Sequence, residues 1–168
     1  MDDLPALDAT DLTLLAALQE DGAMRNVELA SRVGLAPSSC LERVRRLRRL
    51  GVLRGVHAEV EPSALGIGLR AFVRVQIRRH GRKEVEGFQE HALSLSEVVA
   101  VHHLTGEDDF LLEVAVRDPA HLRDLAVDGF ATRPEVGRIQ TSLLFSSVRK
   151  PSLPCWREPN RGGVRKNA

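Results

Sequence analysis

Apolar residues recur at helical spacing in three stretches of the first 50 residues. Asp8 and Asp11 have the D-x-x-D spacing that caps a helix N-terminus. The second stretch runs from 26 to 34, and in the third an apolar residue stands at every third position from Leu41 to Leu50. The pattern predicts three short helices with one core, made of Leu12, Leu15, Leu18, Leu29, Val33, Leu41, Val44 and Leu47.

The second and third helices have the features of a helix-turn-helix. Gly34 suits the left-handed conformation that ends a helix, and Pro37 suits the first position of the next one. In this motif the N-terminal part of the second helix contacts base edges in the major groove. After Gly51 the alternation of Val52, Arg54 and Val56 predicts a wing hairpin or a strand that ends at Pro62.

From residue 69 the periodicity changes to that of a mixed sheet and helix domain. Apolar and polar residues alternate over 69–78, and the order that follows is helix, strand, strand, helix, strand, over 82–94, 97–106, 109–116, 119–130 and 137–150. This order predicts a ferredoxin-like βαββαβ domain with helices on one face of its sheet. The other face keeps apolar residues and needs a partner, most simply a second subunit, because it carries Phe72, Leu111, Leu144 and Val148.

The predicted fold class is therefore α+β, with an N-terminal winged helix-turn-helix followed by the βαββαβ domain. We expect the first domain over 1–62, a linker over 63–68, the second domain over 69–150, and a mobile basic tail over 151–168. The tail is predicted from its Pro and Gly content and its lack of periodicity.

Charge is distributed unevenly around the third helix. Six Arg and one Glu between Ser38 and Arg54 give +5, whereas the rest of 1–62 has two Arg and nine acids, which gives −7. Positive charge confined to one helix favours a phosphate-binding surface, although arginines also solvate the outer face of a core helix. The residues expected to contact double-stranded DNA are Ser38, Ser39, Glu42, Arg43, Arg45, Arg46, Arg49 and Arg54.

Several classes of protein and site are disfavoured by composition. No apolar run reaches the ~20 residues that span a bilayer, and the acidic start is unlike a signal peptide, so a cytoplasmic, nucleoid-associated protein is expected. Cys40 and Cys155 form no disulfide framework or zinc pattern. His102 and His103 are expected on opposite faces of one strand, so no metal site is predicted.

Four segments, in this order, resemble the Lrp/AsnC family of bacterial transcriptional regulators: LDATDLTLLAALQEDG, NVELASRVGLAPSSCLERVRRL, LTGEDDFLLEV and QTSLLFSSVRK. The resemblance covers roughly 7–150, and it identifies the βαββαβ domain as the RAM type of that family. It implies homodimers formed through these domains, often assembled into octamers. It also implies binding to paired DNA half-sites and a response to amino acids.

The resemblance further implies an effector pocket between subunits, near a G-x-x-D turn that Gly106 and Asp109 match. Backbone N–H groups of such a turn can hold a carboxylate, and Asp109 can hold an ammonium group or shape the turn. The residues expected at the effector are Thr105, Gly106, Glu107, Asp108, Asp109, Thr141 and Ser142.

Three positions depart from the family's pattern. Ala36 stands where a capping Ser is common, Val56 replaces a common Tyr in the wing, and Asp108 stands where an aromatic residue is frequent. A capping Ser is worth about 1 kcal/mol. The extra acid makes a basic amino acid, or no amino acid, as plausible an effector as leucine.

Two other functions share this layout. Siroheme decarboxylases resemble the same two-domain arrangement, and an architectural DNA-compacting protein would use phosphate contacts with weak sequence choice. The arginine-rich helix favours a sequence-specific transcriptional regulator with an amino-acid effector. We expect no catalytic residue, no metal and no other cofactor.

Overall fold

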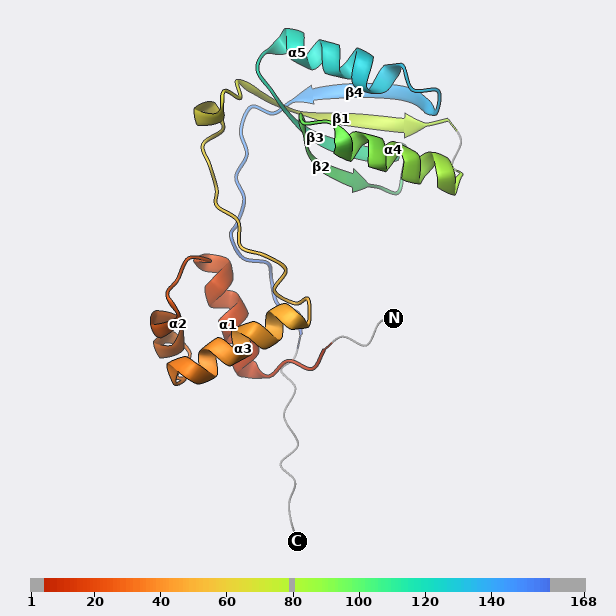
Figure 1. Ribbon diagram of the computed structural model, residues 1–168. Helices are drawn as coiled ribbons and strands as arrows, with labels where there is room; N and C mark the ends of the chain where they lie inside the picture. The colour runs from red at the N-terminus through yellow and green to blue at the C-terminus, as the bar shows by residue number, and fades with distance from the viewer. Residues whose placement is uncertain (1–4, 79–80, 158–168) are drawn as a thin grey trace. The chain divides into compact units, whose positions relative to one another are not determined.

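The computed structural model describes residues 5–78 and 81–157. The chain forms two compact units, one of Met1–Glu59 with Arg149–Ala168 and the other of Val60–Val148. We call them the helical unit and the sheet unit; Figure 1 shows the elements of each. Among the described helices, none has the length and apolar character that crossing a membrane requires.

Three helices make up the helical unit: α1 (Ala9–Glu20), α2 (Asn26–Arg32) and α3 (Pro37–Arg49). α1 begins with the predicted cap, because the Asp8 carboxylate accepts the Asp11 N–H at 2.8 Å and the Asp11 carboxylate accepts the Asp8 N–H at 3.2 Å. Gly34 follows α2 with φ of 68°, a conformation that favours glycine. The three helices and the glycine turn are confirmed.

The buried face of α3 differs from the predicted stripe. Leu41 and Leu50 are 39% and 43% exposed, whereas Cys40 is fully buried together with Val44 and Leu47. At 3.6 residues per turn a spacing of three drifts around the helix, while the spacing 40, 44, 47 keeps one side. The buried core is made of Leu7, Leu14, Ala17, Leu29, Ala30, Cys40, Val44 and Leu47, with Leu12, Leu15, Leu18 and Val33 packed at its margin.

The predicted wing is not formed as a hairpin or a strand. Val52 and Leu53 fold back on the helices, and both of their N–H groups are donated to the Leu47 carbonyl, at 3.0 and 3.1 Å. The described chain has no strand between Val52 and Glu61. Alternating β-branched residues form a strand only where a second strand pairs with them, and none of the described segments does so here.

Ala36, the N-cap residue of α3, provides no side-chain hydrogen bond to the helix. We expect Ala36→Ser to stabilise the helical unit by about 1 kcal/mol, because the new hydroxyl can accept an unpaired N–H of the first turn. Amide hydrogen exchange of α3 measures this change. The control is Ala16→Ser on the exposed side of α1, where the same substitution should cost about 0.5 kcal/mol. Equal exchange in the two variants would contradict the prediction.

The sheet unit has the predicted order of elements. Its strands lie in the order β2-β3-β1-β4 and every neighbouring pair is antiparallel. The elements are η1 (Pro62–Leu65), β1 (Leu69–Ile77), α4 (Arg82–Ser94), β2 (Val98–His103), β3 (Phe110–Val116), α5 (Pro119–Asp124), η2 (Leu125–Ala131) and β4 (Val136–Leu143). The ferredoxin-like topology is confirmed, with a π-helix, η2, continuing α5.

Both helices of the sheet unit cover one face of the sheet (Figure 1). On that face the alternate residues Ala71, Val73, Val75 and Ile77 of β1 are buried. They belong to a core that also contains Phe88, Phe110 and Phe130. The opposite face, which we call the open face, carries the half-buried residues between them in the sequence, Arg70, Phe72, Arg74 and Gln76.

The segments at both ends of the sheet unit depart from the expected boundaries. η1 occupies the expected linker, and β4 ends at Leu143, well before residue 150. Residues 151–157, in the expected tail, are mostly exposed, and two of them are bonded to the helical unit: Leu153 donates its N–H to the Gln19 side chain at 2.9 Å, and Arg157 binds the Pro5 carbonyl at 2.7 Å. Composition does not reveal such contacts between distant residues. The rest of the expected tail, 158–168, lies outside the described residues.

Candidate functional site

The outer side of α3 is polar and exposed. Five of the residues expected to contact DNA are exposed on it, namely Ser38, Ser39, Glu42, Arg45 and Arg49. The carboxylate of Glu42 and the guanidinium of Arg49 are 3.1 Å apart, and each side chain is more than half exposed. Arg54, beyond the end of the helix, is exposed as well. These side chains are accessible to a ligand.

Arg43 and Arg46 lie differently, against the N-terminus of α1. Arg43 Nη1 is 2.7 Å from Asp8 Oδ2 and 2.9 Å from Asp11 Oδ1. Arg46 Nη1 is 2.9 Å from Asp11 Oδ2, and its Nη2 donates to the Ala6 carbonyl at 2.8 Å. Asp11 is 1% exposed. We call Asp8, Asp11, Arg43 and Arg46 the ion-pair cluster; it joins the N-terminus of α1 to the middle of α3.

The charged forms of the cluster are stabilised by its own contacts. Burial acts to raise the pKa of Asp8, but the Asp11 N–H and the Arg43 guanidinium outweigh it, so the pKa lies below its ordinary value. Hydrogen bonds to Asp8 and Asp11 raise the pKa of Arg43. At neutral pH, Asp8 is therefore a carboxylate that faces the guanidinium group of Arg43.

The turn between β2 and β3 contains the other group of expected residues. Asp109 is buried, and its carboxylate accepts the Ile77 N–H at 2.7 Å. Its backbone N–H is donated to the Val75 carbonyl at 3.0 Å, and its carbonyl accepts the Leu104 N–H at 2.8 Å. Gly106, with φ of 130°, has a conformation that favours glycine. Asp109 thus shapes the turn and ties it to β1.

Two arginines offset the acidity of this turn. The guanidinium of Arg138 is 3.0 Å from the Glu107 carboxylate, and that of Arg74 is 4.0 Å from the Asp108 carboxylate. Neither Arg74 nor Arg138 is among the residues expected at the effector, because they lie on β1 and β4, far from the turn in the chain. Thr105, in the same turn, is exposed. The turn thus presents both signs of charge.

Thr141 and Ser142 do not lie together. Thr141 is opposite Val73, on the helix-covered face, and Ser142 is opposite Phe72, on the open face. Ser142 therefore lies on the same face as Arg74 and Asp108, and Thr141 does not. His102 and His103 are likewise opposite Leu111 and Phe110 of β3, so they lie on different faces, as predicted.

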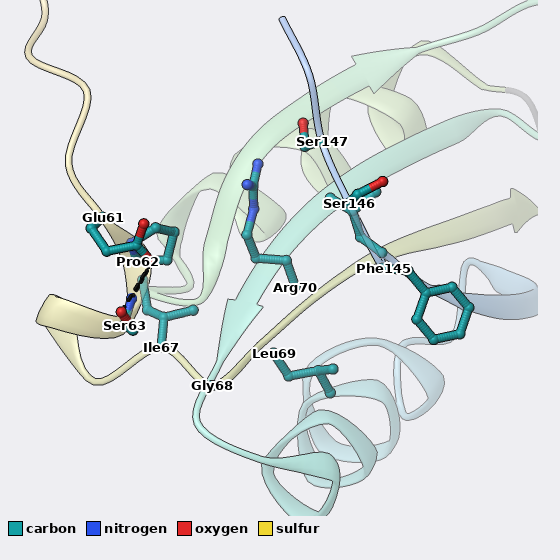
Figure 2. Close-up of a pocket in the computed structure, with 11 residues that line it drawn as sticks. Glu61, Pro62, Ser63, Ile67, Gly68, Leu69, Arg70, Phe145, Ser146 and Ser147 are labelled. Atoms are coloured by element: carbon teal, nitrogen blue, oxygen red, sulfur yellow. Dashed lines mark hydrogen bonds between the residues drawn. The ribbon is translucent and has the colours of Figure 1, made fainter.

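A hollow of about 500 Å³ lies at the other end of β1, between η1 and the segment after β4. In Figure 2, Arg70 points toward the segment that carries Ser146 and Ser147, while Phe145 points away. Arg70 also pairs with Glu113 across the open face. None of the residues expected at a site lines this hollow.

Metal-ligating side chains are dispersed in the described part of the chain, where no three His, Cys, Asp or Glu residues are grouped to hold an ion. Cys40 is buried and Cys155 exposed, and both are free thiols. Most residues expected at a site thus lie in two places, on α3 and in the turn before β3.

Two family models match the chain, one on each unit. Residues 7–48 match the AsnC-type helix-turn-helix domain, and residues 70–153 match the Lrp/AsnC ligand binding domain. The first spans α1, α2 and α3 up to its last residue but one, and the second spans the sheet except for Leu69, the first residue of β1. The exposed helix and the charged turn therefore lie in the DNA-binding type of domain and the ligand-binding type of domain, respectively.

Relatives match nearly the full length of the chain. The HTH-type transcriptional regulator AldR of Mycolicibacterium smegmatis is 40% identical over 146 residues, 87% of this chain and 85% of AldR. The leucine-responsive regulatory protein of Escherichia coli (strain K12) is 36% identical over 144 residues, 86% of this chain and 88% of that protein. A transcriptional regulator of Neisseria meningitidis, solved with L-Met, is similar with a TM-score of 0.81 at 35% identity, covering 89% of this chain and 97% of that chain. The chain belongs to the Lrp/AsnC family of transcriptional regulators.

Proposed function

We propose that the protein binds specific sites on double-stranded chromosomal DNA in the cytoplasm, and that an amino acid changes its DNA binding or its assembly. The observation that carries this proposal is the exposed, arginine-rich side of α3 in a helix-turn-helix of this family. An α-helix fits the major groove of B-DNA, and its exposed polar side chains can contact base edges there. Arg54, just beyond α3, can contact phosphate.

The charged turn before β3 supports an amino-acid effector. A free amino acid has a carboxylate and an ammonium group, and the turn offers Arg74 and Arg138 beside Asp108 and Glu107. The Neisseria relative is described with bound L-Met, and the Escherichia coli relative is named for its response to leucine. Because the two arginines offset these two acids, a neutral amino acid suits the turn at least as well as a basic one.

The open face of the sheet supports a homodimer. Phe72 and Leu111 are only half-buried on it, and the described helices of the sheet unit lie on the other face. A second copy of the sheet unit, related by two-fold symmetry, would cover Phe72 and Leu111 of both copies. The dimer would also bring two copies of α3 to paired half-sites. Assembly of dimers into an octamer is the larger form that we propose.

The test combines DNA binding with ligand response. A duplex is selected from a random library with the full chain, and its affinity is measured with and without each of the twenty amino acids. We expect a selected site that binds at least 10³-fold tighter than random duplex, and one amino acid that changes the affinity by about 5- to 150-fold. Sedimentation of the same samples reports assembly.

The alternatives predict different results. A DNA-compacting protein would bind with a steep salt dependence but would select no site. An enzyme of the siroheme-decarboxylase type would select no site and would bind a tetrapyrrole. Failure to select a site would refute sequence-specific regulation, and a lack of heat in calorimetry with every amino acid would refute the amino-acid effector.

A further inference from the structure

We infer that the arginines of α3 have two different roles. Arg43 and Arg46 are positioning residues that hold α3 against α1, and the contacts to bases are made by the outer stripe, which consists of Ser38, Glu42, Arg45 and Arg49. This inference rests on the proposed function, since it assigns different roles to the residues of the DNA-binding helix.

The outer stripe follows from the observed buried face. Cys40, Val44 and Leu47 are the buried residues of α3, and successive residues are rotated by about 100° around a helix. The spacing 38, 42, 45, 49 also keeps one side, and that side is opposite the buried one. All four residues of the outer stripe are exposed. A helix seated in a groove with its core side away from DNA would direct this stripe to the bases.

Arg43 lies beside the buried face instead. Its side chain is 33% exposed, compared with 64% for Arg49. A contact to DNA would require its guanidinium to leave Asp8 and Asp11, and the buried Asp11 would lose one of its two guanidinium partners. Leaving a buried carboxylate short of partners is costly, whereas a phosphate contact at the surface returns little of that cost.

Arg46 is held at two points that come from different segments. It bonds to the Asp11 carboxylate in α1 and to the Ala6 carbonyl in the segment before α1. The next residue of that segment, Leu7, is buried in the helical core. The ion-pair cluster therefore fixes the angle of α3 against α1, and with it the direction of the outer stripe.

The ion pair of Glu42 and Arg49, unlike the ion-pair cluster, is exposed. Both side chains are more than half exposed, so the pair contributes little to stability and separates at little cost. Arginine can then donate two hydrogen bonds to guanine, and glutamate can accept one from cytosine N4. This pair is thus free to exchange its internal contact for contacts to bases.

The test measures affinity and its salt dependence for the selected duplex and for random duplex. Arg45→Gln and Arg49→Gln should each reduce the ratio of specific to random binding by about 10-fold or more. Arg46→Gln and Asp11→Asn should both reduce the ratio. The double variant Asp11→Asn/Arg46→Gln preserves net charge. Its ratio of specific to random binding should fall no further than that of the more strongly affected single variant, and its salt slope should equal that of the wild type.

Asp11→Asn distinguishes the two roles by the sign of its effect. If Arg43 and Arg46 bind phosphate, removing a nearby acid strengthens binding; if they position α3, removing it weakens binding. Arg43→Lys and Arg46→Lys provide a second criterion, because lysine replaces arginine at a phosphate but not in a cluster that needs two hydrogen bonds from one guanidinium. Circular dichroism melts establish that each variant is folded, and Asp8→Asn, at the half-exposed edge of the cluster, replaces Asp11→Asn if the latter unfolds.

Stronger binding by Asp11→Asn, or full activity of both lysine variants, would overturn the positioning role. Unchanged specificity in Arg45→Gln and Arg49→Gln would overturn the outer stripe. Failure of the wild-type chain to select any site would instead refute the proposed function, and the division of roles would fall with it.

Discussion

Replacing Phe88 with Ala is expected to lower the free energy of unfolding of the sheet unit by about 4 kcal/mol. Phe88 is fully buried on α4, and its ring centroid is 4.9 Å from that of Phe110 and 6.2 Å from that of Phe130. The substitution removes apolar contacts with both rings and leaves a cavity that a close-packed core fills only in part. Urea unfolding followed by circular dichroism measures the loss.

The matched control is Leu93→Ala on the same helix. Leu93 is 59% exposed, so its replacement should change the free energy of unfolding by about 0.5 kcal/mol or less. Hydrogen exchange in β1, which packs against the core, should accelerate in Phe88→Ala and remain unchanged in Leu93→Ala. Similar urea midpoints for the two variants would mean that Phe88 does not organise this core.

Replacing Asp109 with Ala is expected to cost about 2–3 kcal/mol. The substitution removes the carboxylate that accepts the Ile77 N–H in a buried position, at the place where the turn joins β1. Because the turn depends on this contact, Asp109→Ala should also abolish the amino-acid response. Urea unfolding and calorimetry with the effector measure the two losses separately.

Asp108→Ala is the control for this second prediction. Asp108 is partly exposed and lies 4.0 Å from Arg74, so its loss should change stability by about 0.5 kcal/mol or less. A change in the heat of effector binding to Asp108→Ala would then report the contact with the effector alone, because the fold of the turn is unchanged. If Asp109→Ala were as stable as Asp108→Ala, the role of Asp109 in the turn would be wrong.

These substitutions distinguish charged residues that support the fold from charged residues that are accessible at a candidate site. Asp109 and Arg43 both seemed suited to ligand binding by residue type, yet each is already bonded to distant parts of its own unit. Variants of such residues change the fold and the function together. Asp108 and Arg45 are better probes, because replacing them alters the surface and leaves the packing in place.

Local spacing was sufficient to predict most of the elements. The D-x-x-D cap, Gly34 and Pro37 set the limits of the three helices, because capping and φ preferences act within a few residues. The alternation in β1 and the order of the later elements likewise predicted the ferredoxin-like sheet. The family resemblance rested on the same local segments, and the comparisons confirm it.

Most of the elements, their order and the family could thus be predicted from the sequence. The tertiary structure was needed to establish which side of α3 is buried, that 52–61 forms no strand, and that Leu153 and Arg157 bond to the helical unit. It also decided that Arg43 and Arg46 bind Asp8 and Asp11, about 35 residues away in the chain, and that Asp109 binds the Ile77 N–H. Pairing of this kind depends on how the helices and strands pack, and the spacing of residues within a single element does not contain that information.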